Sequence, residues 1–225
     1  MQVDLILGPT GTGKTAASVR LAHVTGAPVV VLDRFQCFRD LAVVSGRPTA
    51  GELAGTRRIY LDDRTLSLGE LGAESAFSEL VRTTSGLVRT HPLVIMEGGS
   101  ISLCRLVAER AEQLGWQMSV EVKLAQPNSP AYLARVRRRV VAMLAARPSL
   151  LDELVKAWQH VDRREFIASI CGFDAVLDWC AENDRQPSEF DLSPSETAVL
   201  VDRIVASHSR YAQLQMKALH ELGLH

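Results

Sequence analysis

Residues 8–15 read GPTGTGKT, and this stretch decides the fold. It matches the G-x-x-x-x-G-K-[ST] pattern of a phosphate-binding loop, or P-loop, in which backbone N–H groups surround a phosphate chain. Residues 3–7, VDLIL, read as a short strand before the loop, and residues 14–23, KTAASVRLAH, read as the start of a helix after it. Because the motif has the strand and helix that it requires, the sequence predicts a phosphate site, without saying for which phosphate compound.

The glycines, the lysine and the last threonine of this loop each suit the binding of a phosphate chain. Glycines let the backbone turn and come close to an anion, and the helix that follows adds its positive N-terminal end. Lys14 can place a cation on a diphosphate, and the Thr15 hydroxyl can be a ligand of Mg²⁺. We therefore expect Mg²⁺ as the cofactor, Thr15 as its ligand, and a phosphate site formed by Gly11, Thr12, Gly13, Lys14 and Thr15.

Composition limits the class of protein. The chain has 225 residues, of which 47% are hydrophobic and 23% are charged, as expected of a globular protein with a substantial core. This length fits one domain, or one domain with an appended lobe. The formal net charge of −1 argues against a broad basic face for nucleic acid.

Cysteine usage and hydropathy favour a cytoplasmic protein. The cysteines form no C-x-x-C pair, so no zinc or redox motif is visible and we expect reduced thiols. The sequence begins with no basic-then-apolar signal region, and no apolar run reaches membrane-spanning length. We expect no nucleic acid and no membrane as partners. The sequence leaves the oligomeric state open, with a monomer as the expectation.

The second expected strand places a carboxylate near the loop. Residues 29–32, VVVL, form a continuous β-branched run that suits a parallel strand buried on both faces, and Asp33 follows it directly. Ligands of open α/β sheets lie beyond the carboxyl ends of the strands, so Asp33 should lie near the end of the first strand. Asp33 is thus the first catalytic candidate, and the alternative is a helix cap or a turn residue.

Further strands and helices follow. Residues 93–96, LVIM, read as a third buried strand, and the Glu97 that ends it is placed as carboxylates of the Mg²⁺ shell are in P-loop proteins. Residues 118–124 alternate apolar and polar side chains, which predicts a half-exposed or edge strand. Between the strands at 29–32 and 93–96 we expect a long polar loop over 34–67 and a helix over 69–89.

The second half of the sequence is mostly helical in pattern. A helix over 130–146 begins with Pro130 and carries four arginines. One of them reaches the ligand phosphates, or all of them form a solvated basic face. Helical patterns continue over 150–182 and, after the capping box SPSE, from 194 to about 221. His208 and Tyr211 share a face of this last helix, a spacing that by itself is more typical of packing or surface.

These elements predict a P-loop NTPase-like α/β fold. Parallel strands that alternate with helices form a doubly wound parallel sheet with helices on both faces. We expect residues 1–225 to form a single domain, in which about 130–225 contribute a small, mostly helical C-terminal lobe over the site.

The motifs in their order resemble a known family. GPTGTGKT is followed by LDRFQC at 32–37, SGRPT at 45–49, YLDDR at 60–64 and EGGS at 97–100. Together they closely resemble the bacterial adenylate dimethylallyltransferases, the isopentenyltransferases of cytokinin biosynthesis. The resemblance is dense over residues 1–105 and thinner afterwards. The related transfer-RNA dimethylallyltransferases share the first motif type but are longer.

This resemblance implies prenyl transfer. Dimethylallyl diphosphate would place its diphosphate in the P-loop, and the N6 amine of AMP would accept the prenyl group. Asp33 would remove a proton from that amine, and Ser45 would help to orient it. Thr10 could donate to the bridging oxygen of the diphosphate, and Lys14 and Arg139 would stabilise the departing charge.

The chain departs from the family pattern in its second half. Cys171 stands where the bacterial members have an aspartate near the acceptor. His208 and Tyr211 stand where they have, in order, a tyrosine and a histidine, and that histidine is linked to a hydroxylated prenyl donor. We expect all three residues to contact substrate. The choice between dimethylallyl and hydroxylated donor therefore stays open, with dimethylallyl diphosphate as the expectation, and so does AMP against ADP or ATP.

Other functions compete with prenyl transfer. A small-molecule or nucleotide kinase would use the same loop and Mg²⁺ but would consume ATP. A transfer-RNA modifier would need surface charge and an anticodon-binding insert, which the net charge and the length of 225 residues disfavour. A nucleotide switch without catalysis would keep the loop but would not need Asp33.

Overall fold

The protein is built on one parallel sheet. The computed structural model describes residues 2–188 and 190–224, and within them five strands pair in the order β3-β2-β4-β1-β5. All of the pairings are parallel. The strands are β1 (Gln2–Leu7), β2 (Val29–Leu32), β3 (Arg58–Ile59), β4 (Leu93–Gly98) and β5 (Gln117–Val122).

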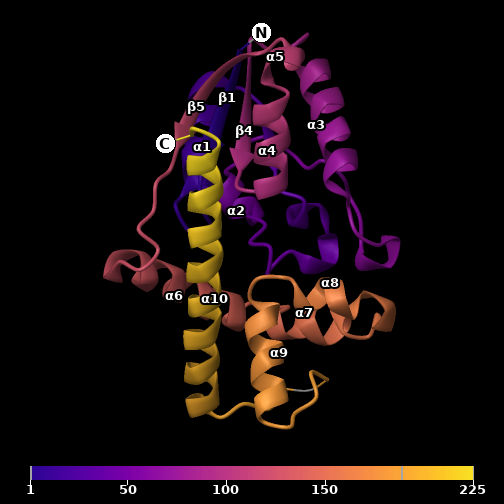
Figure 1. Cartoon of the computed structure of the whole chain (residues 1–225), viewed down its shortest axis with the longest axis vertical. Helices are drawn as coiled ribbons and strands as arrows, with labels where there is room; N and C mark the ends of the chain where they lie inside the picture. The colour runs from indigo at the N-terminus through magenta and orange to yellow at the C-terminus, as the bar shows by residue number, and fades with distance from the viewer. Residues whose placement is uncertain (1, 189, 225) are drawn as a thin grey trace.

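Helices cover the sheet and extend beyond it (Figure 1). The last helix runs beside both the sheet and the group of helices below it, so it contributes to both parts of the molecule. The helices are α1 (Lys14–Thr25), α2 (Ala50–Leu53), α3 (Ala73–Leu87), α4 (Ile101–Glu109), α5 (Ala111–Leu114), α6 (Pro130–Ala145), α7 (Leu150–Ala157), α8 (Arg164–Ala168), α9 (Phe173–Glu182) and α10 (Pro194–Glu221).

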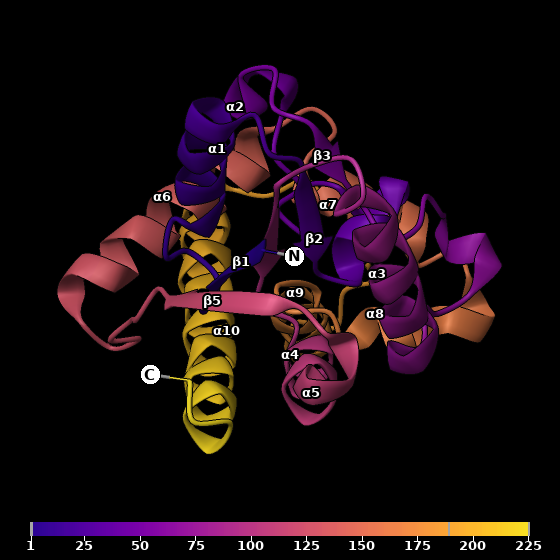
Figure 2. The same cartoon turned by 90° about the horizontal axis from the view of Figure 1, so that it is seen from above.

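Successive side chains of a strand point to opposite faces of the sheet, and both faces are buried. Leu5 of β1 packs in the same cluster as residues of α3 and α4, whereas its neighbour Ile6 packs in a second cluster with Ala17 and Ala22 of α1. Helix α1 therefore covers one face, and α3 and α4 cover the other (Figure 2). Strands buried on both sides are typical of parallel sheets with crossover helices. The predicted doubly wound α/β fold is confirmed.

Local signals fix the helix ends near the expected residues. Ser193 and Glu196 form the predicted capping box of α10, with Pro194 in the first turn. The Ser129 hydroxyl accepts a bond from the Tyr132 N–H at the start of α6. Each cap satisfies backbone N–H groups that have no partner within the helix.

Several boundaries differ from the expectations. The helix predicted over 69–89 is shorter, Ala73–Leu87, and the pattern over 150–182 is interrupted between α7, α8 and α9. The loop predicted over 34–67 contains α2 and the strand β3, which is only Arg58–Ile59 and too short to leave a periodic signal. In addition, β4 lies between β1 and β2, so the ends of the first two strands are separated by a third.

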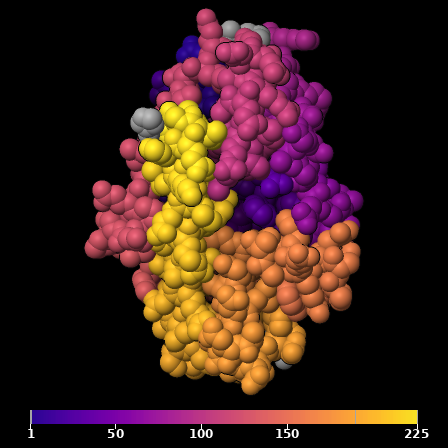
Figure 3. All heavy atoms as spheres, viewed as in Figure 1, coloured from indigo at the N-terminus to yellow at the C-terminus, as the bar shows by residue number. Residues whose placement is uncertain are grey.

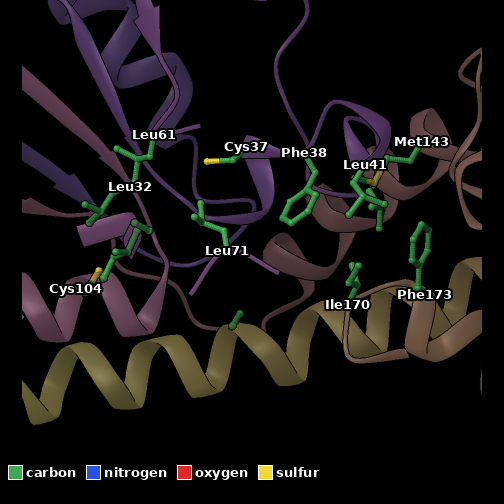
Figure 4. Close-up of a cluster of buried hydrophobic side chains, with 14 of the residues drawn as sticks. Leu32, Cys37, Phe38, Leu41, Leu61, Leu71, Cys104, Met143, Ile170 and Phe173 are labelled. Atoms are coloured by element: carbon green, nitrogen blue, oxygen red, sulfur yellow. The ribbon is translucent and has the colours of Figure 1, made fainter. Parts of the chain in front are cut away.

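One cluster of buried side chains joins the sheet to the C-terminal helices. Figure 4 shows Phe38 and Leu41 between the sheet and the side chains of Ile170 and Phe173. The rings of Phe38 and Phe166 lie 5.8 Å apart, between centroids. This shared cluster supports the prediction of a single domain, which stays a prediction.

None of the helices in the described part of the chain combines the length and apolarity needed to cross a membrane.

Candidate active site

A cavity of about 550 Å³ lies beyond the carboxyl ends of β1, β2 and β4. Figure 3 shows the hollow, with a floor from the first part of the chain (indigo), framed by α10 (yellow), α4 (magenta) and the C-terminal lobe (orange). The cavity brings together most of the residues that the sequence predicted, namely Thr10, Lys14, Thr15, Asp33, Ser45, Glu97, Arg139, Cys171, His208 and Tyr211.

The other three predicted residues, Gly11, Thr12 and Gly13, belong to the loop but do not line the cavity. Gly13 has a φ of 83° and caps α1, a conformation that glycine adopts without strain. The Thr12 hydroxyl donates to the Pro9 carbonyl at 2.8 Å. The loop conformation is therefore held by a side-chain hydrogen bond within the loop and by the left-handed backbone conformation of Gly13.

Lys14 lines the cavity, and its Nζ donates to the Pro9 carbonyl at 2.7 Å. Burial lowers the pKa of its ammonium group, while the nearby carboxylates of Glu97 and Asp33 act in the opposite direction. A desolvated cation with only a carbonyl acceptor is well placed to exchange that bond for one to a phosphate oxygen.

Thr15, Glu97 and Arg58 form a buried polar group. The Thr15 hydroxyl lies 3.4 Å from Glu97 Oε2, and Arg58 Nη2 lies 2.6 Å from the same oxygen. Both partners of this ion pair are almost fully buried, at 2% and 3% exposure of their side chains. The ion pair compensates the desolvation of Glu97, which sits beside the P-loop.

The oxygen atoms of Thr15 and Glu97 are ligands of the kind that Mg²⁺ prefers. Hard oxygen ligands suit Mg²⁺, which commonly takes few protein ligands and completes its shell with water and substrate phosphates. The Thr15 hydroxyl and the Glu97 carboxylate offer such oxygens next to each other. Within residues 2–188 and 190–224 no three His, Cys, Asp or Glu side chains gather as a metal site. Substrate phosphates and water would complete the Mg²⁺ shell.

Asp33 caps a turn and lines the cavity, and its role as the catalytic base stays a prediction. Its Oδ1 accepts from the backbone N–H of Phe35 at 2.9 Å and of Gln36 at 3.4 Å, so it caps the short 3₁₀ turn Phe35–Cys37. Its carboxylate also lines the cavity. Burial raises the pKa of this carboxyl, although the two N–H groups and Lys14 oppose the shift. A carboxylate made more basic in this way is a better proton acceptor.

Only one of the four arginines of α6 lies in the cavity wall, and it is Arg139. Arg135, Arg137 and Arg138 are exposed, and Arg137 pairs with Asp202. Arg139 is half-buried, and no carboxylate of the described residues lies within ion-pair distance of it. Burial lowers its pKa, while the charge of Asp33 opposes the shift. Arg139 is thus a cation available to an anionic ligand, and the other three form the solvated face.

Four further predicted residues line the cavity, namely Cys171, His208, Tyr211 and Ser45. Cys171 Sγ lies 3.3 Å from His208 Nδ1. Burial lowers the pKa of His208 to about 4, so its ring is neutral near pH 7, and its Nε2 is buried without a partner among the described residues. Burial also raises the pKa of Cys171 to about 12. These four side chains are therefore uncharged near pH 7, and they offer thiol, imidazole and hydroxyl groups for hydrogen bonds.

Sequence reasoning missed several residues of this region. Gln215 lines the cavity and lies seven residues after His208 and four after Tyr211, so helical spacing extended by one turn would have found it. Tyr132 donates from its hydroxyl to the Thr10 carbonyl at 3.1 Å. Arg58 left no signal in the sequence, because its partner Glu97 is distant in the chain.

Comparison with known sequences agrees with this geometry. The family model of the isopentenyl transferases matches residues 1–224. The chain is 37% identical over 214 residues to the adenylate dimethylallyltransferase of Rhodococcoides fascians, covering 94% of this chain and 84% of that one. It is also 37% identical over 220 residues to the adenylate dimethylallyltransferase of Agrobacterium fabrum, covering 96% of this chain and 90% of that one.

Solved structures share the fold. The full-length tRNA isopentenylpyrophosphate transferase of Bacillus halodurans superposes with a TM-score of 0.73 at 15% identity, covering 97% of this chain and 86% of that one. A eukaryotic dimethylallyltransferase acting on tRNA gives a TM-score of 0.70 at 14% identity, covering 97% and 69%. The sequence match over nearly the whole chain, together with the P-loop cavity, places the protein: it belongs to the isopentenyl transferase family.

Proposed function

We propose that the protein transfers a dimethylallyl group from dimethylallyl diphosphate to N6 of AMP and releases diphosphate. The observation that carries this proposal is the opening of Asp33 and of the P-loop residues Thr10 and Lys14 into one cavity. A proton acceptor and a diphosphate site are thereby adjacent. The shared name of the sequence relatives favours prenyl transfer over the kinase alternative.

On the acceptor side, Asp33 acts as the general base. The adenine amine is a weak nucleophile because its lone pair is delocalised into the ring. As the bond from N6 to the first carbon of the prenyl group forms, the carbon–oxygen bond to the diphosphate breaks and the N6 proton passes to the Asp33 carboxylate. Ser45 lies in the same wall, where its hydroxyl can accept from the amine and orient it.

On the donor side, cations and N–H groups stabilise the diphosphate as it departs. Lys14 and Arg139 supply positive charge, and the loop amides and the Thr10 hydroxyl supply donors. Losing one such preorganised donor typically costs about 3 kcal/mol of barrier. Mg²⁺, when bound by Thr15 beside Glu97, supplies further neutralisation of the phosphate charge.

The finer identity of the substrates is also a proposal. Dimethylallyl diphosphate is proposed as the main donor, and a hydroxylated donor stays open. AMP is proposed as the acceptor over ADP and ATP. A cytoplasmic monomer acting in the first step of cytokinin biosynthesis remains the expectation from the sequence.

Release of diphosphate tests this proposal. The purified protein with Mg²⁺ should release diphosphate only when dimethylallyl diphosphate and AMP are both present, and a chelator should stop it. Lys14→Ala should raise the KM for the donor and lower kcat, because Lys14 contacts the diphosphate in both the ground state and the transition state. Conversion of ATP to ADP without AMP prenylation would support the kinase instead.

A further inference from the structure

A buried glutamine of the last helix holds the phosphate loop. Gln215 is only 5% exposed and lines the cavity. Its Oε1 accepts from the Thr10 backbone N–H at 3.0 Å, and its Nε2 donates to the Gly99 carbonyl at 2.7 Å. One side chain thereby ties α10 to the loop after β1 and to the residue that follows β4.

Thr10 is held from its other side as well. The hydroxyl of Tyr132, a buried residue of α6, donates to the Thr10 carbonyl at 3.1 Å. Both backbone polar groups of Thr10 are therefore bonded to side chains from distant helices. The N–H of Thr10 points to Gln215 and not to the ligand, so the Thr10 hydroxyl is the group with which this residue can reach a ligand in the cavity.

The surroundings leave this arrangement little freedom. A Cβ atom at Gly99 would lie 2.5 Å from the Gly8 carbonyl oxygen and 2.8 Å from Gln215 Nε2, so the backbone of the two loops and the glutamine are packed in contact. A displacement of about 1 Å in a catalytic group can cost about 100-fold in rate. A fixed Thr10 is what a donor to one particular oxygen requires.

We propose that Gln215, together with Tyr132, is a positioning residue that sets the Thr10 hydroxyl against the diphosphate. The proposal rests on the proposed function, because it assigns the Thr10 hydroxyl to the departing diphosphate. It goes beyond that function because Gln215 acts through Thr10 without taking part in bond making. It also explains why α10, far away in the sequence, extends across the phosphate site.

A double-mutant cycle tests the proposal. Gln215→Met keeps the length and loses both bonds, Tyr132→Phe loses only the bond to the Thr10 carbonyl, and Thr10→Val loses the hydroxyl. We expect Gln215→Met to lower kcat roughly 100-fold and Tyr132→Phe to lower it less, with the KM for AMP unchanged. In the Thr10→Val background, Gln215→Met should cost little more, because the group that it positions is already gone.

Matched controls separate positioning from folding. Gln213→Met removes an exposed glutamine of the same helix that bonds to Asn128, and it should leave kcat unchanged. Losses that multiply in the cycle would overturn the proposal, because Gln215 would then act independently of Thr10. Wild-type kcat in Gln215→Met would also overturn it. If that variant fails to fold, the Tyr132→Phe and Thr10→Val cycle decides in the same way.

Binding of inorganic diphosphate distinguishes a failure of this proposal from a failure of the proposed function. Calorimetry with Mg²⁺ and diphosphate needs no acceptor. The wild type should bind, and Gln215→Met should bind about tenfold more weakly, as expected for one lost hydrogen bond. A wild type that binds but does not prenylate AMP would refute the function. Equal binding by both proteins would count against the positioning role whatever the reaction is.

Discussion

Asp33 caps a 3₁₀ turn through Oδ1 and also lines the cavity. Asn at this position can still accept from the Phe35 N–H through its carbonyl oxygen, so the 3₁₀ turn should persist. We expect Asp33→Asn to lower kcat by about 100-fold or more, because general base catalysis is lost. Steady-state kinetics with a melting curve as the folding control measures this. Full activity in a folded variant would show that Asp33 is not the base.

His208 predicts a pH dependence of stability. Burial lowers its pKa from 6.5 to about 4 in the folded protein. Between these values the unfolded chain binds more protons than the folded one, so the free energy of unfolding should fall as the pH is lowered through this window. His208→Gln should flatten this part of the stability curve. Urea unfolding from pH 7 to pH 4 provides the test, and parallel curves for His208→Gln and wild type would contradict it.

At the scale of residues, the sequence predicted those whose roles follow from a local motif. The P-loop and Asp33 after a buried strand were found in this way, Ser45 came from the family resemblance, and the structure brings all of them to one cavity. Gln215 and Tyr132 act on the loop from more than 100 positions away. Such contacts depend on the tertiary packing of α6 and α10, which no local pattern encodes.

Gly46 packs directly against the side chain of Arg139, a residue of helix α6. Gly46 has a φ of 65°, and a Cβ atom there would lie 1.5 Å from Arg139 Nη2. Gly46→Ala should therefore displace the guanidinium and lower kcat/KM for the donor by about 100-fold. Gly55→Ala is the matched control: its φ is 80° but nothing lies within 4 Å of the new methyl group. If the two variants lose activity equally, backbone strain and not the Arg139 contact is the cause.

Strand β3 is held to the sheet by a buried ion pair. Arg58→Met should cost about 3 kcal/mol or more of the free energy of unfolding, because Glu97 is left buried and uncompensated. Arg39→Met breaks an exposed pair with Asp63 at 3.0 Å and should cost about 1 kcal/mol or less. Denaturant unfolding compares the two variants. Equal small losses would contradict this prediction and would mean that Glu97 finds another partner.

At the scale of elements, long periodic segments were predicted well and short ones were not. The strands 29–32 and 93–96 and the helix from 194 carry strong hydrophobic patterns or caps, and all lie close to the expected residues. The two-residue strand β3 and the breaks between α7, α8 and α9 are decided by packing. The order of the strands, with β4 between β1 and β2, is equally non-local.

At the scale of the whole molecule, helices from the end of the chain pack beside the carboxyl ends of the strands and complete the cavity there. The P-loop, Asp33 and Glu97 come from the first 100 residues, and α6 and α10 add Arg139, His208, Tyr211 and Gln215. The family's sequence motifs lie mostly in the first of these parts. This is why the sequence pointed clearly to the P-loop residues of the cavity but left the substrate contacts of Cys171, His208 and Tyr211 open.

Mass spectrometry of the nucleotide product tests the central claim most directly. The protein is incubated with Mg²⁺, AMP and dimethylallyl diphosphate, and fragmentation then locates any added group. The predicted result is AMP heavier by one dimethylallyl group that stays with the adenine fragment, and its absence with Asp33→Asn. Unmodified AMP with ATP converted to ADP in a parallel reaction, or a prenyl group on the ribose or phosphate, would contradict the claim.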